Sequence, residues 1–153
     1  MQVFRIVQDM ARTSDLSGTG AHRLAGRWNS KGVYMLYTAS NSSLALLESL
    51  VHFDPLTIPA QLFILTIDVD DTAPVYELPE ADYPTNWTAA GLFENRAIGD
   101  RWLAEKKFLA LKVRSAVNTF EFNHLFNPLF PNYHNLIMLV NVTSVGVDGR
   151  LIR

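Results

Sequence analysis

Short apolar segments that favour strands recur along this chain, and they do not alternate regularly with helical segments. Residues 61–69, Gln-Leu-Phe-Ile-Leu-Thr-Ile-Asp-Val, predict a long and mostly buried strand because apolar residues dominate the run. Shorter strands are predicted over residues 3–7, 33–39, 109–117 and 136–142. A doubly wound sheet needs helices regularly placed between its strands, so this order of elements predicts an α+β fold instead.

Two helices are predicted among these strands. The first runs from about Leu44 to Phe53 and ends before Pro55, which disfavours helical geometry in the preceding residue. Its first turn can be capped by a side-chain oxygen of Asn41, Ser42 or Ser43.

The second predicted helix covers residues 92–105 and is amphipathic, with Ile98, Trp102 and Leu103 on its inner face. Gly99 lies inside it and lowers its helix propensity by about 1 kcal/mol. The helix is therefore predicted despite an unfavourable residue near its centre.

Three segments are predicted to lack regular structure. Residues 13–32 are rich in Gly, Ser and Arg and show no hydrophobic period. Residues 70–88 contain three prolines and predict an excursion over the surface, and residues 120–133 predict an aromatic loop punctuated by Asn and Pro. Neither flank of 70–88 could bury a core of its own, so residues 1–153 are predicted to form a single domain.

The charge and cysteine content of the chain exclude several classes of function. The formal net charge is −2, so the overall field gives no reason to expect direct nucleic-acid binding. Cysteine is absent, which excludes disulfides and thiolate catalysis and fits a reducing cytoplasm. No apolar run approaches membrane-spanning length, and the four histidines lack the spacing of metal ligands. We therefore expect a cytoplasmic protein with no bound metal.

The distribution of charge is more informative than its total. No acidic residue lies between Leu16 and Leu47, although three basic residues do, and none lies between Lys106 and Phe120. If the fold brings these two basic segments together, they form one anion site on an otherwise acidic protein. The alternative, an uneven surface charge without function, fits the counts equally well.

Arg27 and Tyr37 are candidates for binding a phosphate-bearing, ring-containing ligand. Arg27 has no acidic neighbour in the sequence and could hold a phosphate through its planar guanidinium, beside backbone N–H groups freed by Gly26 and Gly32. Tyr37 could stack on a flat heterocycle, and the alternative is an aromatic residue packed in the core.

Glu48 and Ser115 are candidates for acting on that ligand. Glu48 lies on a narrow polar strip at the margin of a leucine-rich helix, and it is catalytic if that strip lines the pocket or merely solvated if it does not. Ser115 lies in a basic strand, where it could donate a hydrogen bond to a ribose or phosphate oxygen or face solvent.

Taken together, these motifs resemble the RES domain family. The matching segments are Gly18-x-Gly-Ala-x-x-x-x-Gly26-Arg27-Trp28-Asn29-Ser30-x-Gly32, Tyr37-Thr-Ala, Ala45-Leu-Leu-Glu48-Ser-Leu-Val-His52, Ile98-Gly-Asp-x-Trp-Leu103, Ser115-Ala-Val, Asn127-Pro-x-x-Pro131 and Asp148-x-Arg-Leu151. They span nearly the whole chain in the family's order. The chain departs from the family's pattern at Ala25, Arg114 and Phe130.

The resemblance implies a fold and a set of site residues. The fold is an ADP-ribosyltransferase-like, β-rich α+β core with split sheets, flanking helices and a cleft for NAD. The catalytic residues would be Arg27, Tyr37, Glu48 and Ser115, and further ligand contacts would come from Trp28, Asn29 and Arg5. NAD would be the substrate, with inorganic phosphate as a co-substrate if the reaction is a phosphorolysis, and no prosthetic group or metal would be needed.

The resemblance also implies a biological role. RES proteins are typically toxins of bacterial type II toxin–antitoxin systems, so we expect a toxin that depletes NAD by cleaving its nicotinamide–ribose bond. Its partner would be an Xre-type helix-turn-helix antitoxin that covers the active site in a hetero-oligomer. Two alternatives stay open: transfer of ADP-ribose to a cellular protein, and a non-catalytic antitoxin partner or nucleotide sensor.

Overall fold

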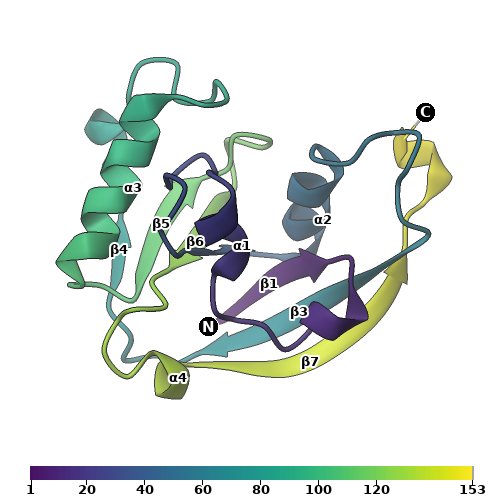
Figure 1. Ribbon diagram of the computed structural model, residues 1–153, viewed down its shortest axis with the longest axis horizontal. Helices are drawn as coiled ribbons and strands as arrows, with labels where there is room; N and C mark the ends of the chain where they lie inside the picture. The colour runs from purple at the N-terminus through teal and green to yellow at the C-terminus, as the bar shows by residue number, and fades with distance from the viewer. Residues whose placement is uncertain (153) are drawn as a thin grey trace.

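The computed structural model describes residues 1–152, and its centre is a seven-stranded sheet (Figure 1). The strands are β1 (Gln2–Val7), β2 (Leu36–Ala39), β3 (Gln61–Val69), β4 (Val75–Glu77), β5 (Ala110–Arg114), β6 (Phe122–Phe126) and β7 (Ile137–Gly146). Their order in the sheet is β4-β5-β6-β2-β1-β3-β7, with β4 and β5 parallel and the other neighbours antiparallel. This arrangement confirms the predicted α+β class.

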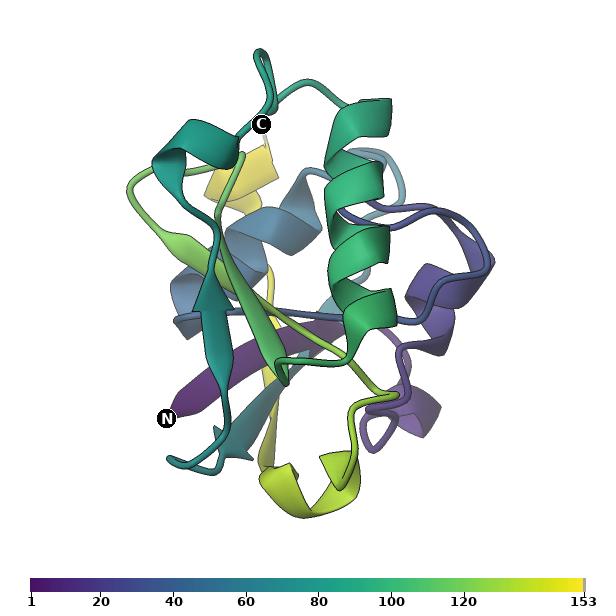
Figure 2. The same cartoon turned by 90° about the vertical axis from the view of Figure 1, so that its left-hand side faces the viewer.

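The helices lie around this sheet. Within the described residues they are α1 (Thr19–Arg23), α2 (Ser42–Leu50), α3 (Phe93–Glu105), α4 (Tyr133–Leu136) and the short 3-10 helices η1 (Met10–Arg12), η2 (Glu80–Asp82) and η3 (Gly149–Ile152). α3 stands beside β4 and β5, which it connects (Figures 1 and 2). Asn41 caps α2 as predicted, because its Oδ1 accepts a hydrogen bond from the Leu44 N–H at 2.8 Å. None of these helices combines the length and the apolar character needed to cross a membrane.

The sheet is nearly divided between β1 and β2. These strands meet at one register pair, Phe4 opposite Ala39, whereas β1 and β3 pair along their length. The Tyr37 carbonyl of β2 accepts instead from Arg5 Nη1, at 3.0 Å. A guanidinium thus takes the place of a backbone donor where the strands diverge, and the split expected in the sheet appears as this narrow junction.

Two apolar clusters hold the sheet and its helices together. The larger packs β1, β3 and the start of β7 against residues such as Leu36 and Phe126 of the other half-sheet. The second joins Trp102 and Leu103 of α3 to the strand residues Leu111, Val113 and Leu125, and it includes Trp28. The helix predicted over 92–105 is therefore confirmed, and it buries Trp102 and Leu103 as expected.

The strand predictions are correct for the long apolar runs and wrong for several bounds. The strand over 61–69 has its predicted bounds, and β1 covers 3–7. The strand predicted over 33–39 begins at Leu36, the one over 109–117 ends at Arg114, and the one over 136–142 extends to Gly146. In each case the pairing of the neighbouring strand, rather than the apolar run itself, sets the end.

Each of the three predicted loops contains regular structure. Residues 13–32 include α1, residues 70–88 include β4, and residues 120–133 include β6. β6 lies between β2 and β5, so its backbone groups pair on both sides and override the polar residues around it. β4 pairs with β5 over three residues after Pro74, which proline permits because its missing N–H lies before the ladder.

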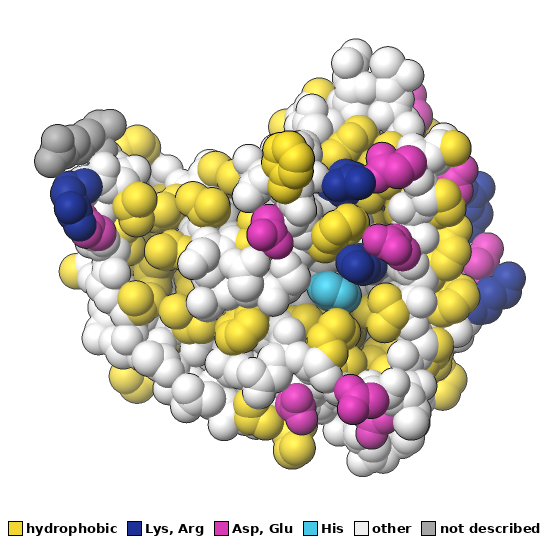
Figure 3. Space-filling model, turned by 180° about the vertical axis from the view of Figure 1, so that it is seen from behind, with side chains coloured by type: hydrophobic (Ala, Val, Ile, Leu, Met, Phe, Trp, Pro, Cys, Tyr) yellow, Lys and Arg dark blue, Asp and Glu magenta, His cyan; other side chains and the backbone are white. Residues whose placement is uncertain are grey.

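The back of the molecule divides into a charged half and, apart from the C-terminal end, a largely uncharged half (Figure 3). The charged half lies over β4 and β5. Within and next to these strands, Lys112 pairs with Glu77 at 3.5 Å and Arg114 pairs with Glu80. The edge strand β7, at the other end of the sheet, contains no charged residue. The charges of β4 and β5 on this face therefore largely neutralise one another.

β6 carries a histidine whose burial makes folding sensitive to pH. His124 is 6% exposed, and burial, with a smaller contribution from Lys112, lowers its pKa from 6.5 to about 4. The folded protein keeps this imidazole neutral at a pH where the unfolded chain binds a proton. We expect the stability that depends on this residue, up to about 3 kcal/mol, to be complete above pH 6.5 and to be lost as pH falls towards 4.

Urea unfolding of a His124→Gln variant between pH 7 and 4 tests this expectation. The free energy of unfolding should fall less steeply in the variant than in the parent. His134 is exposed, so His134→Gln is a matched control that should keep the parent's pH dependence. An unchanged slope in His124→Gln would show that this imidazole does not set the acid stability.

Candidate active site

A cleft with a volume of about 630 Å³ gathers the predicted site residues. This volume lies in the range of small-molecule sites. Four arginines line it, and they are Arg5, Arg27, Arg96 and Arg114. Glu48 is the one carboxylate among its described lining residues. The expectation that Glu48 and Arg27 face a common cavity is therefore confirmed. Of the basic residues in the two basic segments, only Arg27 and Arg114 line this cavity, and Arg114 is paired with Glu80.

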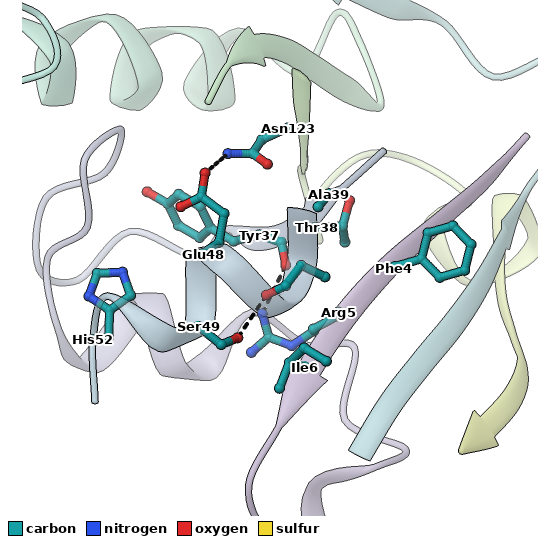
Figure 4. A pocket seen from close by; sticks show the side chains of 11 residues that line it. Phe4, Arg5, Ile6, Tyr37, Thr38, Ala39, Glu48, Ser49, His52 and Asn123 are labelled. Carbon is teal, nitrogen blue, oxygen red and sulfur yellow. Dashed lines mark hydrogen bonds between the residues drawn. The ribbon is translucent and has the colours of Figure 1, made fainter. Parts of the chain in front are cut away.

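A smaller cavity of about 210 Å³ adjoins the cleft (Figure 4). The two cavities share the side chains of Arg5, Tyr37, Glu48, His52 and Asn123. Figure 4 shows Glu48 on α2 next to Asn123 of β6, with Tyr37 of β2 close by. Groups from two other elements thus lie next to the carboxylate.

The Glu48 carboxylate is held through one of its two oxygens. Oε1 accepts hydrogen bonds from Ser115 Oγ at 2.6 Å and from Asn123 Nδ2 at 2.7 Å. Oε2 forms no hydrogen bond with any described residue. Glu48 is half-buried on α2, so this arrangement fixes the carboxylate while leaving one oxygen free for a ligand.

Ser115 lies behind Glu48 rather than on the surface of the cleft. Its side chain is 0% exposed, and its Oγ accepts from the N–H groups of Val117 at 3.1 Å and Asn118 at 3.0 Å. With its own proton donated to Glu48, the hydroxyl has no further capacity for a ribose or phosphate oxygen. Its place in this structure is that of a residue that positions Glu48, and this corrects the expected ligand contact.

Arg27 carries a positive charge without an ion-pair partner among the described residues, and hydrogen bonds fix its orientation. Its Nη1 donates to the carbonyls of Trp87 at 3.0 Å and Ala89 at 2.9 Å. It forms no ion pair with any described residue. The guanidinium therefore keeps its positive charge and several N–H donors for an anion in the cleft.

Tyr37 and Asn29 are joined by a hydrogen bond that anchors residues 18–32, which we call the glycine loop. The Tyr37 hydroxyl donates to Asn29 Oδ1 at 2.6 Å and accepts from the Trp28 N–H at 3.1 Å, and burial raises the pKa of this phenol above its ordinary value. Asn29 is 0% exposed, and its amide donates to three backbone carbonyls, including that of Ala21 at 2.8 Å. Tyr37 lines both cavities. Asn29 lines the cleft, but its amide is bonded to the loop backbone, so the ligand contact that the resemblance implies for it stays a prediction.

Trp28 lines the cleft, but its side chain is almost fully buried. It is 2% exposed and packs near the rings of Tyr83 and Trp87, each with a centroid distance of 6.1 Å. α3 lies directly against its backbone, because a Cβ atom on Gly99 would stand 1.7 Å from the Trp28 carbonyl oxygen. The side chain of Trp28 thus packs in the core next to Arg27, and its ligand contact stays a prediction.

Arg5 lines both cavities from the junction between β1 and β2. Its Nε is buried without a partner among the described residues, and only its Nη1 has one, the Tyr37 carbonyl. Burial, followed by the nearby charge of Arg12, lowers the pKa of Arg5 below its ordinary value. Arg5 is therefore placed for the anion contact expected of it.

Sequence reasoning did not identify Asn123 or Arg96 as site residues. Asn123 lies on β6, which the sequence presents as a loop. Arg96 lies on α3, and a charged residue on an amphipathic helix ordinarily faces solvent. Arg114, one of the departures from the family pattern, lines the cleft but pairs with Glu80.

Known proteins are similar to this chain in sequence and in fold. The family model of the RES domain matches residues 2–140. A protein named Toxin Res from Yersinia enterocolitica is 34% identical over 152 residues, covering 99% of each chain. Another of that name from Pseudomonas putida is 38% identical over 140 residues, covering 90% of this chain and 93% of the relative. A protein of Sphingobium sp. named Prs ADP-ribosylating toxin is 35% identical over 157 residues, covering 98% of this chain and 96% of the relative.

A solved structure has the same architecture. A chain in the crystal structure of the M. tuberculosis MbcT–MbcA toxin–antitoxin complex superposes with a TM-score of 0.64. The alignment covers 99% of this chain and 86% of that chain, at 20% identity. At this identity the likeness establishes a shared fold.

Proposed function

The chain belongs to the RES domain family, and on this basis we propose that it cleaves the bond between nicotinamide and ribose in NAD. One observation carries the proposal: among the described lining residues of the cleft, the one carboxylate, Glu48, lies with three arginines that form no ion pair, Arg5, Arg27 and Arg96. NAD carries two negative charges on its pyrophosphate and a positive charge on its nicotinamide ring. The charges of the cleft are complementary to both.

Glu48 is suited to stabilise the transition state of this cleavage. When the C–N bond breaks, its electron pair leaves with the nicotinamide nitrogen, and positive charge develops on the ribose carbon and ring oxygen, as in glycoside hydrolysis. The free Oε2 of Glu48 can lie against that charge while Oε1 stays bound to Ser115 and Asn123. Nicotinamide leaves as a neutral molecule, so the reaction needs neither a second carboxylate as general acid nor a prosthetic group.

The other residues of the cleft would orient the substrate. Arg27 would bind the pyrophosphate, the ring of Tyr37 would pack against nicotinamide, and Arg5 would contact a phosphate oxygen. An oxygen of water or of inorganic phosphate would then bond to the ribose carbon. Water would release a proton to solvent, whereas the attacking phosphate oxygen is already ionised. The first acceptor yields ADP-ribose, and the second yields its 1-phosphorylated form.

A time course of NAD consumption by the purified protein, with and without inorganic phosphate, tests the proposal. Identification of the products separates hydrolysis from phosphorolysis, since free ADP-ribose comes from water and a phosphorylated product from phosphate. Absence of NAD consumption under both conditions would overturn the proposal.

Transfer of ADP-ribose to a protein is the second candidate, and the name of the Sphingobium relative favours it. It would use the same cleft and the same carboxylate, with a protein side chain as the acceptor in place of water. Incubation of NAD labelled on its ADP-ribose moiety with cell lysate distinguishes the two reactions. Label on one protein band supports transfer, whereas label in small molecules alone supports depletion.

We also propose that the protein is the toxin of a toxin–antitoxin pair, with an Xre-type helix-turn-helix antitoxin that covers the cleft. The names of the relatives and the complex that contains the structural neighbour support this role. Around the cleft, Leu24 is 76% exposed and Val51 is 59% exposed. Such apolar side chains at the rim of a charged site suit a protein that binds over it. Growth arrest on expression, relieved by the antitoxin, is the expected phenotype.

Replacing either hydrogen-bond donor to Glu48, Ser115 or Asn123, should lower turnover more than it weakens binding of NAD. For Ser115→Ala we expect kcat to fall about tenfold to a hundredfold, with KM for NAD within about threefold, because a carboxylate that has lost a donor is less well placed. Asn123→Ala should act in the same direction. The double variant should lose less than the product of the single losses, because both side chains act through one oxygen.

Steady-state kinetics on the three variants check this expectation, with Ser14→Ala as a control because Ser14 is exposed. Losses that multiply in the double variant would show that the two residues act independently of each other, and not through a shared oxygen of Glu48.

A further inference from the structure

Two arginines from distant parts of the chain meet at the glycine loop. Arg27 follows Gly26 in that loop, and Arg96 comes from α3. Arg96 Nε donates to the Gly26 carbonyl at 3.1 Å, and both side chains line the same cleft. We refer to Arg27 and Arg96 as the arginine pair.

Each guanidinium of the arginine pair is bound to backbone on one side only. Arg27 uses Nη1 for the carbonyls of Trp87 and Ala89, and Arg96 uses Nε for Gly26. The Nε and Nη2 groups of Arg27 and both Nη groups of Arg96 form no hydrogen bond with a described residue. Neither arginine forms an ion pair within residues 1–152. Two oriented guanidiniums therefore keep free donors and uncompensated charge.

An anion with two phosphate groups fits this arrangement better than an anion with one. A guanidinium binds phosphate oxygens through parallel N–H donors, so each member of the arginine pair can engage one phosphate. The carbonyl contacts fix both side chains before a ligand arrives, which reduces the entropy lost on binding. A single phosphate would leave one guanidinium without its counter-ion.

We propose that the arginine pair binds the two phosphates of a pyrophosphate and thereby selects dinucleotides over mononucleotides. This inference rests on the proposed function for the identity of the nucleotide. It assigns Arg96 as a binding residue that determines substrate class: NAD is accepted, and nicotinamide mononucleotide, which has one phosphate, is a poor substrate.

Arg96 can be replaced without removing the other contacts that dock α3 on the loop. Asp100 accepts from the Ser30 N–H at 2.9 Å and from its hydroxyl at 2.5 Å. Gly99 packs against the backbone of Trp28. A change in ligand binding on substitution of Arg96 therefore reports on the guanidinium itself.

Calorimetric titration of the Glu48→Gln protein with ADP-ribose and with AMP tests the proposal, since neither ligand can be consumed. With Arg96→Gln added, the affinity for ADP-ribose should fall about tenfold to a hundredfold, as for loss of charge-assisted hydrogen bonds, and the affinity for AMP by less than about threefold. Equal losses for both ligands, or an unchanged affinity for ADP-ribose, would overturn the proposal.

Arg101→Gln is the matched control, because Arg101 is an exposed arginine of the same helix that does not line this cleft. Both affinities should be unchanged in it, and Arg96→Lys should keep only part of the preference for ADP-ribose. If the arginine pair behaves as expected but the parent does not cleave NAD, the proposed function fails and the nucleotide site stands. If the parent cleaves NAD but Arg96→Gln leaves its KM for NAD unchanged, the site assignment fails and the function stands.

Discussion

Glu48→Gln should leave the fold intact and reduce NAD turnover by about a hundredfold or more. The amide has nearly the same shape as the carboxylate and can still accept from Ser115 and Asn123 through its oxygen. It places a neutral NH2 where the free Oε2 stands, so it cannot stabilise the positive charge that develops on ribose. The loss should therefore appear in kcat, with little change in the binding of ADP-ribose.

Steady-state NAD consumption, together with thermal unfolding of parent and variant, measures this effect. Glu94→Gln is the matched control, since Glu94 is exposed at the start of α3 and does not line the cleft. If Glu48→Gln consumes NAD as fast as the parent, the carboxylate has no catalytic role and the proposed mechanism fails. In cells, growth arrest that survives Glu48→Ala would point to a binding role in place of catalysis.

Gly99→Ala should destabilise the protein by about 3 kcal/mol or more, the largest stability effect that we expect from a single methyl group. The added Cβ would stand 1.7 Å from the carbonyl oxygen and 2.7 Å from the carbonyl carbon of Trp28, and both atoms belong to backbone. The gain in helix propensity, about 1 kcal/mol, is too small to offset this collision. Because Trp28 follows Arg27, any folded fraction should also bind nucleotide more weakly.

Urea unfolding at neutral pH measures the free-energy difference between Gly99→Ala and the parent. Gly149→Ala is the control, since a Cβ there meets nothing within 4 Å and its effect should be below about 0.5 kcal/mol. A Gly99→Ala protein as stable as the parent would mean that α3 and the glycine loop are not in close contact. The presence of Gly99 inside a helix, where its propensity is unfavourable, is thus explained by the close contact with the Trp28 backbone.

The sequence predicts the central features of the site because they depend on chemistry that is local. Glu48 follows a capped helix start, and Arg27 lies in a loop without acidic residues, so each is recognisable from its neighbours. Their common cavity is predicted from the family resemblance and confirmed by the fold. The long strand over 61–69 is similarly evident from its own apolar residues.

The sequence misleads where contacts between distant parts of the chain determine the position of a side chain. Trp28 and Asn29 stand in the glycine loop and therefore resemble ligand-binding residues, but both are buried, Trp28 against Gly99 of α3 and Asn29 among backbone groups of its own loop. Asn123 escapes notice because β6 becomes a strand only when β2 and β5 pair with it. Arg96 resembles a solvated helix residue, and only the docking of α3 on the loop brings it to the cleft.

Because β1 and β2 share a single register pair, the sheet should bend most easily at the junction of these two strands, next to the candidate active site. A full ladder of backbone hydrogen bonds resists such bending along its whole length. At this junction only one register pair and the hydrogen bond from the Arg5 guanidinium resist it. Arg5 also lines the cleft, so an anion that attracts its guanidinium acts on this seam as well as on the ligand. We therefore expect nucleotide bound in the cleft to restrain this seam, so that amides along it exchange more slowly with solvent deuterium than in the free protein.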